Sequence, residues 1–153
     1  MDKLIAYFSA TGTTKGVAEK LSKVLNGDLF EIEPVIKYEK KDLNWLNPFS
    51  RSSKEMKKKI KPEVKNKVNN LNDYKTILLG FPVWWYQNPT IINTFLDEND
   101  LSDKKIYIFV TSGSSSHVGS LKKLKEKYPN LNFIDGKRLT GNESEEDLIN
   151  FFK

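Results

Sequence analysis

Hydroxyl side chains gather in one short segment near the start of the chain, Ser9-Ala10-Thr11-Gly12-Thr13-Thr14. The segment offers four hydroxyl groups and one glycine, whose backbone can approach a ligand closely. Apolar residues recur at helical spacing from Val17 to Leu25, so the hydroxyls precede a helix whose first N–H groups have no intrahelical acceptor. Free N–H groups at a helix start attract anions, and we predict that this segment holds a phosphate.

The apolar run Leu4–Phe8 predicts a strand directly before this segment. The helix after the segment is predicted to end at Asn26-Gly27. Four more apolar runs predict further strands, at residues 29–32, 76–81, 106–110 and 131–134. They alternate with helical patterns over residues 89–96, 118–128 and 145–152, the first capped by Asn88 and the last by Ser144. We therefore predict an α/β fold of three layers, a doubly wound five-stranded parallel sheet with helices on both faces.

About forty residues separate the second and third predicted strands, far more than a simple connection needs. Within this excursion, Ser52-Ser53-Lys54-Glu55 has the form of a capping box that opens a short helix, with Met56 and Ile60 facing inward. We expect Trp45, Leu46 and Phe49 to pin the excursion to the body of the protein.

Two more loops follow strands of the predicted sheet, Pro82-Val83-Trp84-Trp85-Tyr86-Gln87 and Thr111-Ser112-Gly113-Ser114-Ser115-Ser116. Ligands of such sheets bind outside the carboxyl ends of the strands, where these loops meet the hydroxyl segment. Three consecutive aromatic residues cannot all point into the core, so at least one is available to stack on a planar ligand. The third loop offers backbone groups near Gly113 for the polar edge of a ring. A phosphate site and a flat-ring site together describe a mononucleotide.

Composition narrows the function classes. The chain has 153 residues, enough for one domain with a single core, and we assign residues 1–153 to one domain. It has no cysteine and one histidine, which excludes thiolate chemistry and a histidine-rich metal site. We predict no metal and no membrane span, and expect a cytoplasmic protein.

The net charge of +5 is concentrated between Lys54 and Lys67, which holds seven lysines and two glutamates. One interpretation is a solvated helix face, and the other is a docking surface for an acidic protein partner. No arginine or aromatic residue is interleaved with these lysines, so we do not expect a nucleic-acid partner.

Together the three loops resemble those of the flavodoxin family. The hydroxyl segment looks like its phosphate loop, and residues 80–86 with residues 111–113 look like the two flavin-ring loops of one short-chain branch with a Trp-Trp loop. In the excursion, Asp42–Trp45 and Ser50–Glu55 are similar to that branch as well. The resemblance implies non-covalent FMN, the strand order 2-1-3-4-5 and electron transfer between redox proteins.

Carried over by position, the resemblance assigns the FMN phosphate to Ser9, Thr11, Gly12, Thr13 and Thr14, with Ala10 contributing backbone. Trp84, Trp85 or Tyr86 would lie against the flavin ring, and Pro82 and Val83 belong to the same cofactor-binding loop. Thr111, Ser112, Gly113 and Ser114 would meet the edge of the ring. The third loop lacks the tyrosine that many flavodoxins stack on the outer flavin face and has Ser114-Ser115-Ser116-His117 instead. One face of the ring is therefore expected to be open.

Three functional hypotheses follow. The first is a low-potential electron carrier between a reductase and an acceptor protein, with no catalytic residue of its own. The second is an FMN-dependent NAD(P)H quinone or nitro reductase, which the open face favours. In that case His117 is either a proton donor or a solvated residue at a helix entry. The third is a non-redox phosphate or nucleic-acid binder, which leaves the tandem aromatic residues unexplained.

Overall fold

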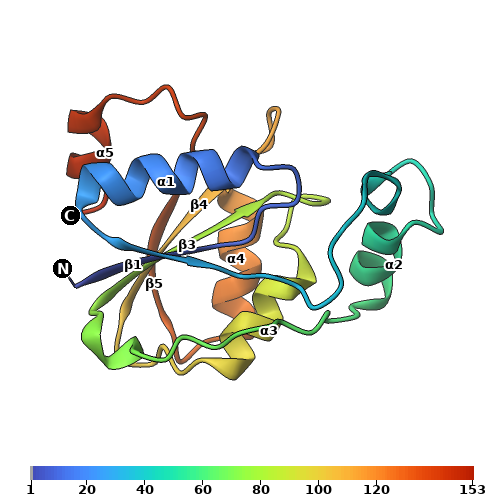
Figure 1. Cartoon of the computed structure of the whole chain (residues 1–153), viewed down its shortest axis with the longest axis horizontal. Helices are drawn as coiled ribbons and strands as arrows, with labels where there is room; N and C mark the ends of the chain where they lie inside the picture. The colour runs from blue at the N-terminus through green and yellow to red at the C-terminus, as the bar shows by residue number, and fades with distance from the viewer. Residues whose placement is uncertain (1) are drawn as a thin grey trace.

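The computed structural model describes residues 2–153. Five parallel strands form one sheet: β1 (Lys3–Tyr7), β2 (Asp28–Glu31), β3 (Thr76–Pro82), β4 (Lys105–Thr111) and β5 (Asn132–Arg138). Their order across the sheet is β2-β1-β3-β4-β5, which confirms the predicted fold and strand order. The two central strands β1 and β3 are buried almost along their whole length, because helices cover both faces of the sheet (Figure 1).

Helices α1 (Thr13–Leu25) and α5 (Glu145–Phe151) lie on one face of the sheet, and α3 (Thr90–Glu98) and α4 (Val118–Lys127) lie on the other (Figure 1). Each face has its own apolar cluster. Leu21 of α1 and Phe152 after α5 belong to the first, and Ile91 and Phe95 of α3 to the second. The sheet thus separates two apolar clusters. The loops that follow the strands lie at the carboxyl ends of the strands.

The excursion between β2 and β3 carries a short 3-10 helix, η1 (Lys40–Leu43), the helix α2 (Arg51–Lys58) and a second 3-10 helix, η2 (Leu71–Asp73). The part with η1 and α2 projects beyond the carboxyl ends of the strands (Figure 1). Trp45, Leu46 and Phe49 are 67%, 74% and 77% exposed, so the prediction that they pin the excursion to the body is wrong. All three side chains lie mostly at the surface of the projection, and Trp45 also lines cavities that are described below.

The start of α2 also differs from the prediction. Ser50 is the N-cap, and its hydroxyl oxygen accepts a hydrogen bond from the Ser53 N–H. The N-cap therefore lies two residues before the one expected, Ser52. Its Met56 is half-buried, whereas Ile60 lies beyond the helix and is exposed, contrary to the inward position predicted for it.

Other element boundaries shift by small amounts. The N-cap of α3 is Pro89 rather than Asn88. Strand β5 extends to Arg138, four residues past its predicted end, because it pairs with β4 through Val110. The predicted stop of α1 is confirmed, since Asn26 adopts a left-handed conformation after its last turn. Within residues 2–153, no helix has the length and apolar character needed to cross a membrane.

Candidate functional site

The segment of residues 9–14 forms a tight loop between β1 and α1. Gly12 is the N-cap of α1 and has a φ of 96°, a left-handed conformation that favours glycine. The Ser9 hydroxyl oxygen accepts hydrogen bonds from the N–H groups of Gly12, at 3.0 Å, and Lys15, at 3.1 Å. Within the described residues, the N–H groups of Thr13 and Thr14 have no protein acceptor. These two donors at a helix start make the loop a suitable anion site.

The first and third loops are joined beneath the surface. The Thr14 hydroxyl lies 2.8 Å from the Thr111 hydroxyl at the end of β4. Thr14 is only 2% exposed, so its side chain holds the two loops together and is not available to a ligand. The Thr111 carbonyl also accepts a hydrogen bond from the Val83 N–H, which ties the second loop to the third at 3.0 Å. The three predicted loops therefore meet at one edge of the sheet.

The second loop contains a two-residue turn. Trp84 and Gln87 exchange both backbone hydrogen bonds, at 2.9 and 3.1 Å, and Trp85 and Tyr86 occupy the central positions. Their φ angles are 49° and 64°, left-handed values that cost a residue with a Cβ on the order of 1–2 kcal/mol. Backbone in such conformations is concentrated at functional sites, and this turn places two aromatic rings at the carboxyl end of β3.

The three aromatic residues of this loop have different environments. Trp84 packs edge-to-face against Phe8, with ring centroids 5.8 Å apart, and against Tyr38, at 5.6 Å. Trp85 and Tyr86 are 41% and 75% exposed. Trp84 is therefore a half-buried residue that anchors the turn, and Trp85 and Tyr86 are the more exposed rings.

A cavity of about 320 Å³ lies between the second loop, the third loop and the excursion, and we name it the ring cavity. It is lined by Leu43, Trp45, Ser52, Val83, Trp84, Trp85, Tyr86 and Ser115. Its volume is at the lower end of the range of about 300–1,000 Å³ for small-molecule sites. Aromatic and aliphatic side chains form most of its wall, which suits a flat ring.

Ser52 supplies an unmet polar group in the ring cavity. The residue is 2% exposed, and its Oγ has no hydrogen-bond partner within residues 2–153. A buried hydroxyl without a partner costs free energy, so a partner for this group would stabilise the folded protein. The cavity thus combines stacking walls with a hydrogen-bonding group of the excursion, as a heterocycle requires.

Arg138, at the end of β5, holds the third loop in place. Its guanidinium donates hydrogen bonds to the carbonyls of Ser112, at 3.1 Å, and Gly113, at 2.9 Å, and to the Ser112 hydroxyl at 3.2 Å. The Ser112 hydroxyl in turn donates to the Ser115 carbonyl. This network orients the segment that brings Ser115 to the ring cavity.

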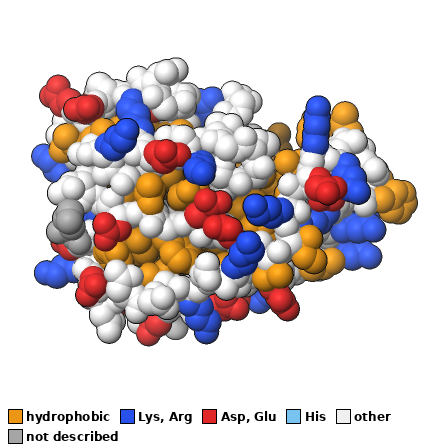
Figure 2. All heavy atoms as spheres, in the orientation of Figure 1, with side chains coloured by type: hydrophobic (Ala, Val, Ile, Leu, Met, Phe, Trp, Pro, Cys, Tyr) orange, Lys and Arg blue, Asp and Glu red, His pale blue; other side chains and the backbone are white. Residues whose placement is uncertain are grey.

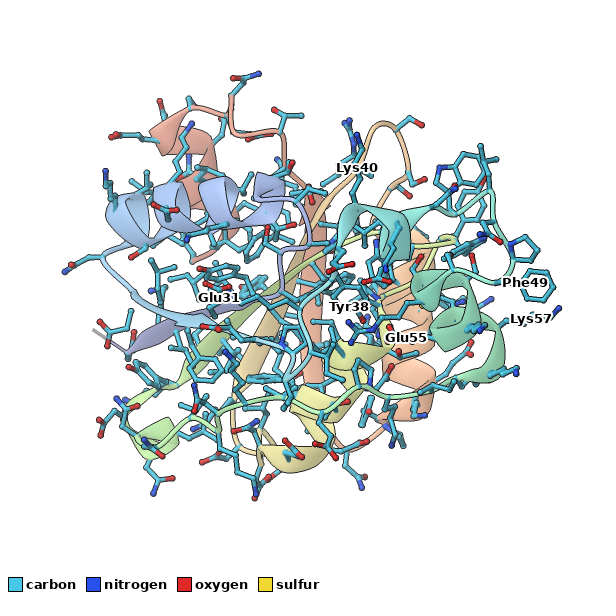
Figure 3. All side chains as sticks on the ribbon, turned by 45° about the vertical axis from the view of Figure 1, so that its right-hand side comes forward. Glu31, Tyr38, Lys40, Phe49, Glu55 and Lys57 are labelled. Atoms are coloured by element: carbon cyan, nitrogen blue, oxygen red, sulfur yellow. The ribbon has the colours of Figure 1, made fainter. Side chains whose placement is uncertain are left out.

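A buried polar cluster attaches the excursion to the site. Glu55 is buried, accepts a hydrogen bond from Arg51 at 2.8 Å and accepts another from the Tyr38 hydroxyl. The Arg51 guanidinium lies 3.8 Å from the centre of the Tyr38 ring and donates to the Ile36 carbonyl. Burial and the hydrogen bond to Glu55 raise the pKa of Tyr38 well above its usual value, so the hydroxyl stays protonated. Figure 3 shows Tyr38 and Glu55 close together where α2 meets the segment that follows β2.

The structure divides the predicted site residues into two groups. Val83, Trp84, Trp85 and Tyr86 line the ring cavity, whereas the segment of residues 9–14 forms the separate anion loop. Ser112 and Gly113 contact Arg138, and Gly113 and Ser114 are exposed beside the cavity without lining it. Pro82 ends β3 beneath the second loop, and Ala10 packs against the apolar cluster.

Sequence reasoning missed Leu43, Trp45 and Ser52 as cavity residues, and Arg138 as a positioning residue. The motif resemblance of residues 42–45 and 50–55 was the available signal for the first three. Arg138 had none, because it was expected to lie in a connection after β5. His117 precedes α4 and is half-buried, with its ring against Gly136 and outside the ring cavity.

Comparison with known proteins agrees with this geometry. The family model described as flavodoxin matches residues 2–153. The chain belongs to the flavodoxin family.

A solved structure similar to this flavodoxin-family chain is a candidate flavoprotein from Bacteroides eggerthii, with 42% identity and a TM-score of 0.95 over 98% of this chain and 94% of that one. A candidate flavoprotein from Bacteroides uniformis is 41% identical, with a TM-score of 0.91 over 98% and 96% of the two chains. A flavoprotein in complex with FMN from Lactobacillus acidophilus shares the fold, with 24% identity and a TM-score of 0.75 over 99% and 97%. No curated protein matches the sequence.

The residues of this flavodoxin-family site fit a flavin nucleotide. The anion loop offers two free N–H groups, and the ring cavity offers aromatic walls and the unpartnered Ser52 hydroxyl. In the described part of the chain, no group of acidic or histidine side chains is arranged to hold a metal ion. The arrangement can therefore bind and orient a flavin nucleotide.

Proposed function

We propose that the protein is an FMN-dependent electron carrier that exchanges electrons with redox proteins at low potential. The observation that carries the proposal is the ring cavity beside the anion loop, with two stacking aromatic residues and an unpartnered hydroxyl at one edge of the sheet. The relative from Lactobacillus acidophilus with the same fold is a complex with FMN, which supports the choice of cofactor.

FMN would supply the electron-accepting chemistry, and the chain's residues would position it. The N–H groups of Thr13 and Thr14 would hold the phosphate, with the Ser9 hydroxyl beside them as a further donor. Trp85 and Tyr86 would lie against the ring, and Ser52 would donate to one of its polar atoms. Neutral donors suffice here because an anion at a helix start is stabilised by the helix dipole.

The low potential follows from the wall of the ring cavity. Val83, Trp84 and Trp85 are apolar, and no cation of residues 2–153 lines the cavity. An added negative charge in such surroundings is destabilised, because burying charge without a partner costs several kcal/mol. We therefore expect the oxidised state to be favoured.

The structure narrows the proposed docking surface for protein partners. Of the seven lysines from Lys54 to Lys67, Lys61 forms an ion pair with Asp97 at 2.7 Å and Lys65 with Glu33 at 3.6 Å. Lys54, Lys57, Lys58 and Lys59 lie on α2 or directly after it and are exposed. Figure 2 shows basic side chains gathered at the end of the molecule that carries the projection. An acidic partner docked there would approach the ring cavity.

One observation favours a second candidate, a reductase that acts directly on a small substrate with NAD(P)H. Among the residues described, the third loop contributes Ser115 to the ring cavity and no aromatic ring. One face of a bound flavin would then be open to a hydride donor.

FMN binding is the first test. The purified protein is expected to be yellow and to release FMN on denaturation, and protein stripped of cofactor should quench FMN fluorescence on titration. Protein that is colourless and takes up neither FMN nor FAD would refute the proposal. A preference for FAD would contradict the proposal that FMN is the cofactor. The electron-transfer role would then be decided by the kinetic assay described next.

Steady-state kinetics separates the carrier from the reductase. We expect NADPH oxidation to need an added partner reductase, and its rate to fall steeply with salt, since charge steering is screened over about 10 Å at 0.1 M. The triple variant Lys54→Glu, Lys58→Glu, Lys59→Glu should lower the rate of electron transfer with the partner. The matched control is the triple variant Lys122→Glu, Lys123→Glu, Lys125→Glu on α4, which should not lower it. Fast turnover with a quinone and no partner would establish the reductase instead.

A further inference from the structure

A second cavity, of about 410 Å³, adjoins the ring cavity, and we name it the outer cavity. The side chains of Trp45 and Trp85 line both cavities and so lie where the two meet. None of the residues that join the three loops to one another lines the outer cavity. Its lining differs otherwise from that of the ring cavity and comes from α2, the segment before it and the end of the second loop.

The lining of the outer cavity is suited to an aromatic ligand. Besides the two tryptophans, Leu46, Pro48 and Met56 contribute apolar surface, and the Met56 side chain is half-buried on α2. Indole faces stack on planar rings, and a thioether makes favourable contacts with their edges. The volume is within the range of small-molecule sites, about 300–1,000 Å³.

The charges around the outer cavity indicate which charge its ligand carries. Lys57 lines the cavity and is exposed, and Figure 3 shows it at the outer end of the projection near Phe49. Five basic side chains lie within residues 51–59, against Glu55 as the single carboxylate. That carboxylate is buried and paired with Arg51, so it does not offset the lysine charge at the cavity. No carboxylate of the described residues lines the outer cavity.

We infer that the outer cavity binds a planar aromatic compound that carries a negative charge, such as an aromatic carboxylate. Its ring lies against Trp45 and Trp85, and its anionic group lies next to Lys57, with the Gln87 amide as a further polar contact. The inference concerns this cavity alone and does not depend on which cofactor occupies the ring cavity.

Isothermal titration with 2-naphthoate, and with neutral 2-naphthalenemethanol for comparison, tests the site in both FMN-loaded and FMN-free protein. We expect naphthoate to bind about 1.4- to fivefold more tightly, the effect of one exposed ion pair of about 0.2–1 kcal/mol. Lys57→Gln should remove the difference. Lys58→Gln, an equal change of charge at a neighbouring residue that does not line the cavity, should keep it. Trp45→Ala should weaken both probes about tenfold, and it should fold because Trp45 is mostly exposed.

The position of the probe is checked by NMR. Naphthoate should shift the Met56 methyl signal and the indole N–H signals of Trp45 and Trp85, and FMN should not displace it. Equal affinity of the two probes in both Lys57→Gln and unaltered protein would overturn the inference, as would no binding at millimolar probe. Displacement by FMN would also overturn it, by placing the probe in the ring cavity, and would leave the proposed function intact. Failure of FMN to bind while naphthoate binds would overturn only the proposed function.

Discussion

The hydroxyl oxygens of Thr14 and Thr111 lie 2.8 Å apart, in a buried hydrogen bond between residues 97 positions apart in the sequence. The bond joins the start of α1 to the end of β4, and so fixes the anion loop relative to the third loop. Its energy depends on both partners, because a buried hydroxyl that loses its partner retains its cost of desolvation.

Thr111→Val should lower the free energy of unfolding by about 1–3 kcal/mol, since it leaves the Thr14 hydroxyl unpaired. Thr14→Val introduced into the Thr111→Val variant should lower the free energy of unfolding much less than Thr14→Val does in the unaltered protein. The reason is that the double variant leaves neither hydroxyl buried without a partner. Urea denaturation of the two single variants and the double variant measures the coupling. Strictly additive losses would show that the bond contributes nothing.

Trp84→Ala and Trp85→Ala should affect different properties. Loss of the Trp84 ring leaves a void beside Phe8 and Tyr38, and we expect a loss of about 3 kcal/mol in the free energy of unfolding. Trp85→Ala should cost under about 1 kcal/mol of stability. It should raise the dissociation constant of FMN about tenfold, through loss of stacking. Denaturation and fluorescence titration of both variants distinguish the roles, and similar profiles would contradict the division.

The left-handed conformation of Tyr86 predicts that Tyr86→Gly is more stable than Tyr86→Ala. Both variants remove the ring, and only alanine keeps the Cβ that makes a φ of 64° costly. The difference in the free energy of unfolding should be about 1 kcal/mol in favour of glycine. Both should bind FMN more weakly than the unaltered protein. A more stable alanine variant would mean that the turn relaxes in solution.

Arg138→Met should loosen the third loop. Its three hydrogen bonds to Ser112 and Gly113 would be lost, so amide hydrogen exchange in residues 112–116 should quicken. FMN affinity should fall by up to about tenfold, the effect of about 1.4 kcal/mol. The control is Lys137→Met, an equal change of charge on the same strand. Lys137 lies over the Phe151 ring, so its loss should change neither the hydrogen exchange nor the FMN affinity. Unaltered exchange in Arg138→Met would refute the positioning role.

Acid pH should remove the contribution of Asp97 to the free energy of unfolding. Burial alone would raise the pKa of Asp97, but hydrogen bonds from Lys61 and Tyr128 outweigh it and hold the pKa below its ordinary value. A lowered carboxyl pKa stabilises the fold above about pH 4, and this contribution is lost as the pH falls through the folded value. The Asp97 and Lys61 side chains are 36% and 46% exposed, so the contribution should be below about 1 kcal/mol.

The loss of stability in Asp97→Asn relative to the unaltered protein should therefore be largest near neutral pH and shrink below pH 4. Urea denaturation across that range measures it. Glu126→Gln removes an exposed carboxylate for comparison. A difference that grows toward acid would reverse the assigned direction of the pKa.

Much of the fold was predictable from local patterns. Continuous apolar runs such as Ile77–Phe81 mark strands covered on both faces, and their alternation with helical patterns implies a parallel sheet. The boundaries of α2 and β5 were not predictable. Ser50 and Ser52 are both common cap residues by type, and only packing buries Ser52 within α2 and leaves Ser50 as the cap.

The sequence by itself determined the α/β sheet, the anion loop and the aromatic loop, because each depends on residues that are neighbours in the chain. Only the tertiary structure decided which aromatic residues are free, since Trp84 is covered by Phe8 and Tyr38 from two distant segments. It also decided that Trp45 and Ser52 of the excursion close the ring cavity and that Arg138 orients the third loop. Such contacts depend on how the long excursion and the last strand pack against the sheet, and local sequence patterns do not encode that packing.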